Sequence, residues 1–162
     1  MIPDNLNLVK SSDIVRKFHE IESDRAAAIL AACHIEQCLK EFIQLYMVEE
    51  PEKAADILLN TRNSVGAFST QILFARACDW ITEDIKKDLD TIRLIRNKFA
   101  HNPDQHDFSE IPDEQRFHDF SQIYHSDLRA QYLITVSMTV GQMWNKILPF
   151  LRKKQKAEES SE

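Results

Sequence analysis

The sequence predicts an all-α protein, a four-to-five-helix up-and-down bundle with short accessory helices. The chain has only two glycines among 162 residues, whereas strand-rich folds need frequent turns that favour glycine. Several long segments repeat apolar residues at steps of three and four, the period of an amphipathic helix. The length suits a single domain. We therefore expect one helical domain over residues 1–152 and a flexible charged tail over residues 153–162.

The first half of the chain is expected to hold one central helix between two short ones. A short helix over residues 12–21 follows serine and aspartate oxygens that can cap it. The strongest apolar pattern lies in residues 23–47, where Ser23 or Asp24 could provide the cap. The residues that form its stripe are Ala28, Ala32, Ile35, Leu39, Phe42 and Tyr46. Another short helix is expected over residues 52–60.

The second half begins with a turn over residues 61–66 and a helix over residues 67–80. Thr82 can cap the next helix, over residues 83–100. The buried stripe of that helix is expected to consist of Ile85, Leu89, Ile92, Ile95 and Phe99. Pro103 limits its continuation, because the residue before a proline is pushed out of helical geometry.

The segment after Pro103 is expected to be irregular over residues 102–111, with a short helix over residues 112–126. The last long helix begins near Asp127, and Pro149 is expected to kink or end it. From Arg152 onward the chain is charged and is expected to fray in solvent.

Charge and cysteine content narrow the function classes. The net charge of −6 weighs against a protein that coats DNA, because phosphate neutralisation supplies most of such binding. No apolar run is long enough to span a membrane, and the N-terminus lacks the pattern of a secretory signal. Three cysteines, Cys33, Cys38 and Cys78, suggest neither a disulfide framework nor a zinc site. We expect them to be small core residues of a cytoplasmic protein.

The string RNKFAH at the end of the predicted helix over residues 83–100 contains Arg96, Asn97 and His101. On an ideal helix Arg93, Asn97 and His101 share one face, whereas Arg96 lies about 140° from His101 around the axis. A distortion before Pro103 or the reach of the arginine side chain could still bring Arg96 and His101 together.

The chemistry of this string suits phosphodiester cleavage. His101 titrates near neutral pH and can transfer protons. The guanidinium of Arg96 can stabilise developing negative charge on phosphate oxygens, and Asn97 can position either group. No carboxylate cluster at metal spacing accompanies them, so neither a metal nor another cofactor is expected. The structural alternative is that cationic residues occupy the last turn because they complement the negative end of the helix dipole.

The same string resembles the Arg-x4-6-His motif of the HEPN superfamily. Three ordered segments, over residues 22–43, 66–81 and 88–101, are similar to blocks of the mannitol operon repressor (MltR)-like branch of that superfamily. The resemblance implies an all-α bundle that forms a homodimer, with the motifs of both subunits lining a shared cleft. Active HEPN members are metal-independent endoribonucleases of toxin–antitoxin or phage-defence systems, so the implied partners are RNA and a cognate antitoxin or regulatory protein.

The resemblance also implies roles for single residues. His101 would be the proton-transfer residue, Arg96 would stabilise the phosphorane-like charge, and Asn97 would position one of them. The MltR-like branch is named for transcriptional regulation, however, and some of its members lack the motif. A non-catalytic regulator or interaction module is therefore the main alternative, and a nucleotide-binding or scaffold domain is the third.

Six further residues are candidates for supporting or RNA-binding roles. Glu22, Asp24 and Arg25 either orient the motif from across the bundle or serve as an ordinary helix cap with a salt bridge. Arg93 and Lys98 either widen a phosphate-binding patch or belong to a solvated face. Glu36 lies near the central stripe, where a buried carboxylate needs a partner, and we expect that partner to be Arg93 or Arg96.

Overall fold

The computed structural model describes residues 8–47, 59–60, 65–111, 120–121 and 126–160. Within these ranges the chain forms helices and contains no strand, which confirms the predicted all-α class. The elements in chain order are α1 (Leu8–Ile21), α2 (Asp24–Tyr46), α4 (Phe68–Ala77), α5 (Glu83–His101), the short 3-10 helix η2 (Phe108–Glu110) and α7 (Leu128–Glu159). The predicted helix over residues 52–60 falls almost entirely outside the described residues, as does most of the one over residues 112–126.

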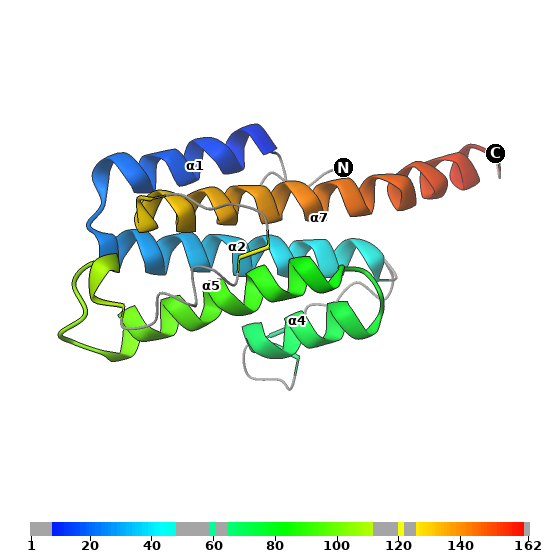
Figure 1. The fold of residues 1–162 in the computed structure, drawn as a ribbon. Helices are drawn as coiled ribbons and strands as arrows, with labels where there is room; N and C mark the ends of the chain where they lie inside the picture. Colours follow the sequence, from blue (N-terminus) through cyan, green and yellow to red (C-terminus); the bar gives the residue numbers. More distant parts are fainter. Residues whose placement is uncertain (1–7, 48–58, 61–64, 112–119, 122–125, 161–162) are drawn as a thin grey trace.

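Helix α2 occupies the centre of the bundle, as its wide apolar stripe predicts. It packs against α1, α4, α5 and α7 (Figure 1). Its buried residues include five of the six stripe residues, and only Tyr46 remains partly exposed. Tyr132 of α7 is fully buried against α2 and donates a hydrogen bond to the carbonyl of Ala28 (2.9 Å). This bond satisfies a phenol in an otherwise apolar core.

Side-chain caps fix where two of the helices begin. The hydroxyl of Ser23 accepts a hydrogen bond from the amide of Ala26 at the start of α2. Thr82 does the same for the amide of Ile85 at the start of α5. Between α4 and α5 the chain turns through Asp79, whose φ of 55° lies in the left-handed region that aspartate tolerates better than most residues. These caps confirm two of the predicted helix starts.

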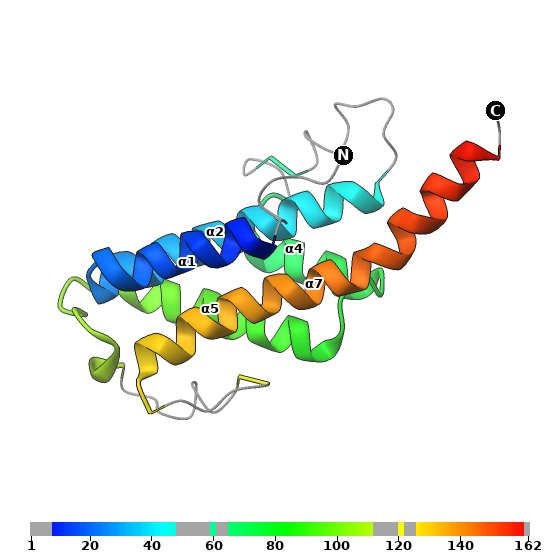
Figure 2. The ribbon, with the colours of Figure 1, turned by 90° about the horizontal axis from the view of Figure 1, so that it is seen from above.

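Helix α7 departs from the sequence prediction at its C-terminal end. A frayed tail was expected from residue 152 and a flexible tail over residues 153–162, but the helix continues to Glu159 with Pro149 inside it. Proline removes one backbone hydrogen bond but does not unwind a long helix that already exists on both sides. The residues that follow are mainly Arg, Lys, Gln, Ala and Glu, which are strong helix formers. The C-terminal part turns away from the line of the first part (Figure 2).

The cysteines also differ from expectation. Only Cys38 is a core residue, and its burial raises the pKa of its thiol to about 12. Cys33, within α2, and Cys78, the C-cap residue of α4, are exposed. None of the helices in the described ranges combines the length and apolarity that a membrane span requires.

Candidate functional site at the end of α5

Helix α5 stays regular through His101 and ends at Asn102. The buried residues of α5 face the core on one side, so Asn97 and His101 lie on the opposite, outer part of its surface. Arg93 lies in the same row, but its side chain is only 24% exposed. His101 is exposed to solvent, and Asn97 is partly exposed. Leu94, on the same outer face, leaves 38% of its surface exposed. The outer face of α5 therefore presents an imidazole, an amide and an apolar side chain to solvent.

Arg96 lies on a different side of α5. A guanidinium nitrogen of Arg96 is 3.5 Å from a carboxylate oxygen of Glu36 on α2, and both side chains are about three-quarters buried. The partner predicted for Glu36 was Arg93 or Arg96, and it is Arg96. Arg93 instead contacts Asp90 on its own helix (3.4 Å).

The environment of the Glu36–Arg96 pair is poorly solvated. Burial raises the pKa of the Glu36 carboxyl, and the nearby charge of Arg96 opposes that rise. Burial also raises the pKa of the Tyr132 phenol, again opposed by Arg96. Arg96 is therefore close enough to the core to influence α7 as well as α2. Within one chain, the structure does not bring Arg96 and His101 to the same surface.

The loop that follows His101 is held by residues at the start of α2. Nη1 of Arg25 donates hydrogen bonds to the carbonyls of Asn102 (3.2 Å) and Pro103 (3.1 Å). The carboxylate of Asp24 accepts a hydrogen bond from the amide of Phe108 (3.0 Å). These contacts cross the bundle between residues far apart in sequence. Asp24 and Arg25 thus lie where they can fix the backbone on both sides of the turn that leaves α5.

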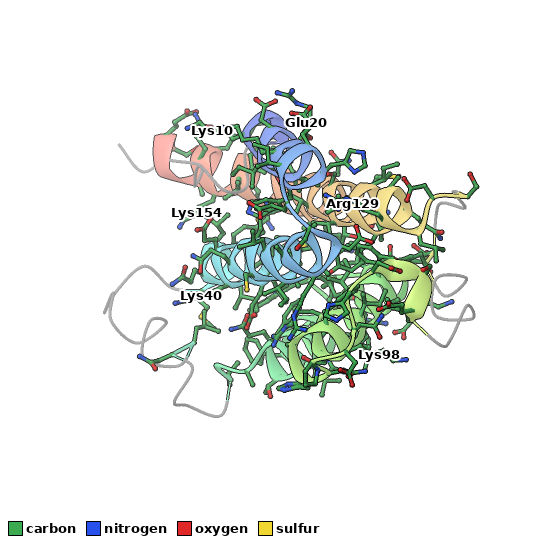
Figure 3. The ribbon with its side chains drawn as sticks, turned by 90° about the vertical axis from the view of Figure 1, so that its left-hand side faces the viewer. Lys10, Glu20, Lys40, Lys98, Arg129 and Lys154 are labelled. Carbon is green, nitrogen blue, oxygen red and sulfur yellow. The ribbon has the colours of Figure 1, made fainter. Side chains whose placement is uncertain are left out.

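Arg129 is the residue at this end of the bundle that sequence reasoning missed. Its Nη1 is 2.6 Å from the Asp24 carboxylate. Its Nη2 donates to the carbonyls of Phe18, His19 and Glu22, at 2.7–2.8 Å. One arginine thus caps the C-terminal end of α1 and joins it to α2 and α7 (Figure 3). Glu22 participates through its backbone carbonyl.

Phe108 anchors the same loop in the core. Its ring centroid is 4.9 Å from that of Phe99 on α5 and 5.3 Å from that of Tyr132 on α7. Phe108 is 2% exposed. The sequence predicted an irregular segment here and did not predict the buried aromatic contact or the short helix η2. The one sequence signal was an isolated phenylalanine within a polar stretch.

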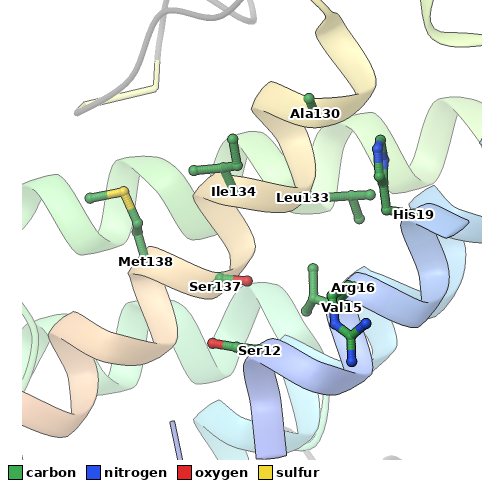
Figure 4. A pocket seen from close by; sticks show the side chains of 9 residues that line it. All are labelled: Ser12, Val15, Arg16, His19, Ala130, Leu133, Ile134, Ser137 and Met138. Atoms are coloured by element: carbon green, nitrogen blue, oxygen red, sulfur yellow. The ribbon is translucent and has the colours of Figure 1, made fainter. Parts of the chain in front are cut away.

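Two pockets lie away from the outer face of α5. An open apolar pocket of about 310 Å³ separates α1 from α7, and none of the predicted site residues lines it (Figure 4). A more polar pocket of about 370 Å³ lies beside α2 and α4, and Glu36 is the one predicted site residue in its lining. Lys98 is partly buried on α5. Among the described residues, no group of three or more His, Cys, Asp or Glu side chains could hold a metal ion.

The arrangement defines a helical-bundle protein with an exposed polar face at one helix end and a separate, largely buried ion pair between α2 and α5. Comparisons of the chain with protein-family models, with curated proteins and with solved structures find no match. The HEPN-like and MltR-like resemblance therefore rests on the residues of the chain itself.

Proposed function

We propose that this chain is a HEPN-like protein that acts on RNA as a homodimeric, metal-independent endoribonuclease of the toxin–antitoxin or defence type. The observation that carries the proposal is the exposure of His101 beside Asn97 on the outer face of α5, within the RNKFAH string. An exposed imidazole at a fixed helix end can reach a polymeric substrate, whereas a buried one could not.

In the proposed reaction, the ribose 2′-oxygen attacks the adjacent phosphorus and the bond from phosphorus to the 5′-oxygen breaks. His101 accepts the proton of the 2′-hydroxyl, and a solvent water molecule supplies the proton that the departing 5′-oxygen takes up. The products are a 2′,3′-cyclic phosphate and a 5′-hydroxyl. Arg96 would stabilise the additional negative charge on the phosphorane, and Asn97 would orient the imidazole or the phosphate.

A homodimer gives Arg96 a route to the reacting phosphate. Because Arg96 and His101 lie on different sides of one α5 helix, an Arg96 from one subunit would act with the His101 of the other. Two-fold pairing of the bundles near α5 would produce two such composite sites. The exposed side chain of Leu94 supplies an apolar contact for that pairing.

The test is RNA cleavage in the presence of EDTA by the wild type and by His101→Ala. We expect the wild type to release fragments with 2′,3′-cyclic phosphate ends, and His101→Ala to lose at least about 100-fold in rate, the usual contribution of a proton-transfer residue. His106→Ala is the matched control, since His106 is also exposed and lies five residues further along the chain. Equal cleavage by both variants and the wild type would overturn the role of His101.

One observation favours a second candidate function, a non-catalytic MltR-like regulator or interaction module. The largely buried ion pair with Glu36 restrains Arg96 in a structural role within the chain. If the wild type cleaves no RNA although it is folded and dimeric, the regulator is the better description. In that case His101→Ala should change neither the melting temperature nor the oligomeric state.

A further inference from the structure

The C-terminal part of α7, residues 146–159, projects beyond the other helices in both views of the bundle (Figures 1 and 2). We call this segment the basic arm. At its base the ring of Phe150 packs on Tyr46 (centroids 4.7 Å apart), which stacks on Trp80 (4.8 Å). The hydroxyl of Tyr46 also donates to the carbonyl of Lys146 (3.4 Å). Beyond Leu151 the segment has no large apolar side chain, so packing does not explain the rest of it.

The basic arm carries four exposed cations that are not paired with any carboxylate among the described residues. Lys146, Arg152, Lys153 and Lys156 are exposed and form no ion pair with any described residue. The other described arginines have partners. Arg25 donates to backbone carbonyls, and those that contact a carboxylate are Arg16, Arg76, Arg93, Arg96 and Arg129. In a chain of net charge −6, a local cluster of unpaired cations is a feature that folding does not require.

The spacing of these cations places them together on one broad side of the helix. Lys146 and Lys153 are seven residues apart, and Arg152 and Lys156 are four apart, so each pair is superposed along the axis. From Lys146 to Lys156 the helix rises about 15 Å. Ile147 and Leu151 point to the opposite side, toward the core. The exposed side is thus a row of cations about as long as a few nucleotides of phosphate backbone.

We propose that the basic arm is an RNA-docking surface that binds the phosphate backbone of single-stranded RNA without reading its sequence. The inference rests on the proposed action on RNA and adds where the substrate is held. The C-terminal end of α5 lies at the opposite end of the bundle from the arm (Figure 1), about 30 Å away by the length of α5. A strand cut by the same subunit would therefore run along the bundle and have to be several nucleotides long.

The experiment measures binding of a fluorescent single-stranded RNA of about 20 nucleotides over a range of salt concentrations. The arm variant carries Arg152→Gln, Lys153→Gln and Lys156→Gln together. The matched control carries Lys10→Gln, Lys17→Gln and Lys87→Gln, which removes the same amount of charge from exposed positions on α1 and α5. Circular dichroism establishes that both variants remain helical.

We expect the arm variant to bind RNA at least about tenfold more weakly than the wild type at low salt, with a logarithmic salt dependence shallower by about two, as expected for three lost phosphate contacts. The control should bind within about twofold of the wild type. The proposal is overturned if the wild type does not bind this RNA at low salt, if the arm variant binds as the wild type does, or if the control loses as much as the arm variant. If the arm instead docks an acidic protein, the wild type would not bind this RNA at low salt.

The failure of this inference is distinguishable from failure of the proposed ribonuclease activity. His101→Ala should bind RNA as the wild type does, because His101 is not on the arm. RNA binding that depends on the arm, without cleavage by the wild type, would leave the docking surface standing and remove the nuclease. Cleavage that depends on His101, with RNA binding unaffected in the arm variant, would support the nuclease and remove the docking surface.

Discussion

Arg129 shows how one side chain can join three helices. Its guanidinium donates hydrogen bonds to three backbone carbonyls at and just after the C-terminal end of α1, and it also pairs with the carboxylate of Asp24. Asp24 in turn accepts from the amide of Phe108. The loop after His101 is thereby coupled to the junction of α1, α2 and α7.

Replacement of Arg129 by alanine should be strongly destabilising. The substitution leaves the largely buried carboxylate of Asp24 without its cationic partner and removes a donor from the carbonyls of His19 and Glu22. We expect this loss to lower the free energy of unfolding by about 3 kcal/mol. Urea unfolding followed by circular dichroism measures the effect. Arg152→Ala is the control and should leave the midpoint nearly unchanged, because Arg152 is exposed and makes no ion pair within the described residues. A similar small effect for Arg129→Ala would contradict the account of the junction.

Some of the site could be predicted from single residues and some could not. The need of Glu36 for a cationic partner follows from its position beside an apolar stripe, and the partner was limited to two arginines by the helix on which they lie. The contact between Arg129 and Glu22 joins residues 107 positions apart. No local pattern encodes such a contact, because it depends on how the ends of three helices meet.

At the scale of elements, periodicity predicted α2 and α5 well because each has a long apolar stripe between recognisable caps. Periodicity predicted the end of a helix less well where a helix-breaking residue competes with neighbours that favour helix. Pro149 was expected to kink or end α7, and the charge of the tail suggested an end. The helix continues past Pro149, because the residues that follow favour helix, and its C-terminal part turns away from the line of the first part (Figure 2). The start of α1 was also predicted incorrectly. The helix begins at Leu8, four residues before the predicted start.

The contact between α1 and α2 should weaken in mild acid. Nε2 of His34 on α2 lies 2.8 Å from the hydroxyl of Ser11, which is buried on α1. Burial lowers the pKa of His34, and the nearby charge of Glu41 partly opposes this. The unfolded chain therefore takes up this proton at a higher pH than the folded chain does. Stability due to His34 is present above its ordinary pKa of 6.5 and is lost as the pH falls through the lowered folded-state pKa.

His34→Gln tests this prediction, because glutamine can still reach Ser11 but does not titrate. Free energies of unfolding measured from neutral pH to pH 5 should fall more steeply for the wild type than for the variant. The other histidines are common to both proteins and cancel in the comparison. Parallel curves for the two proteins would show that His34 is not the group responsible.

At the scale of the whole molecule, the two ends of the bundle differ in character. The end of α5 presents His101 and Asn97 on a backbone fixed by Arg25, Asp24 and Phe108. The opposite end extends into the basic arm. A chain of net charge −6 thus carries a local cluster of exposed cations, which is the surface proposed to dock RNA. The fold class was predictable from composition and periodicity, whereas the separation of Arg96 from His101 required the helix to remain regular up to Asn102.

The central claim is that Arg96 of one subunit acts with His101 of the other. The most direct measurement mixes Arg96→Ala with His101→Ala under conditions that allow subunits to exchange and then follows RNA cleavage in EDTA. Each variant alone should be inactive. Half of the dimers in an equal mixture are mixed, and each mixed dimer contains one intact composite site, so the account predicts recovery of roughly a quarter of the wild-type rate. No recovery, despite mixed dimers detected by mass spectrometry, would contradict it.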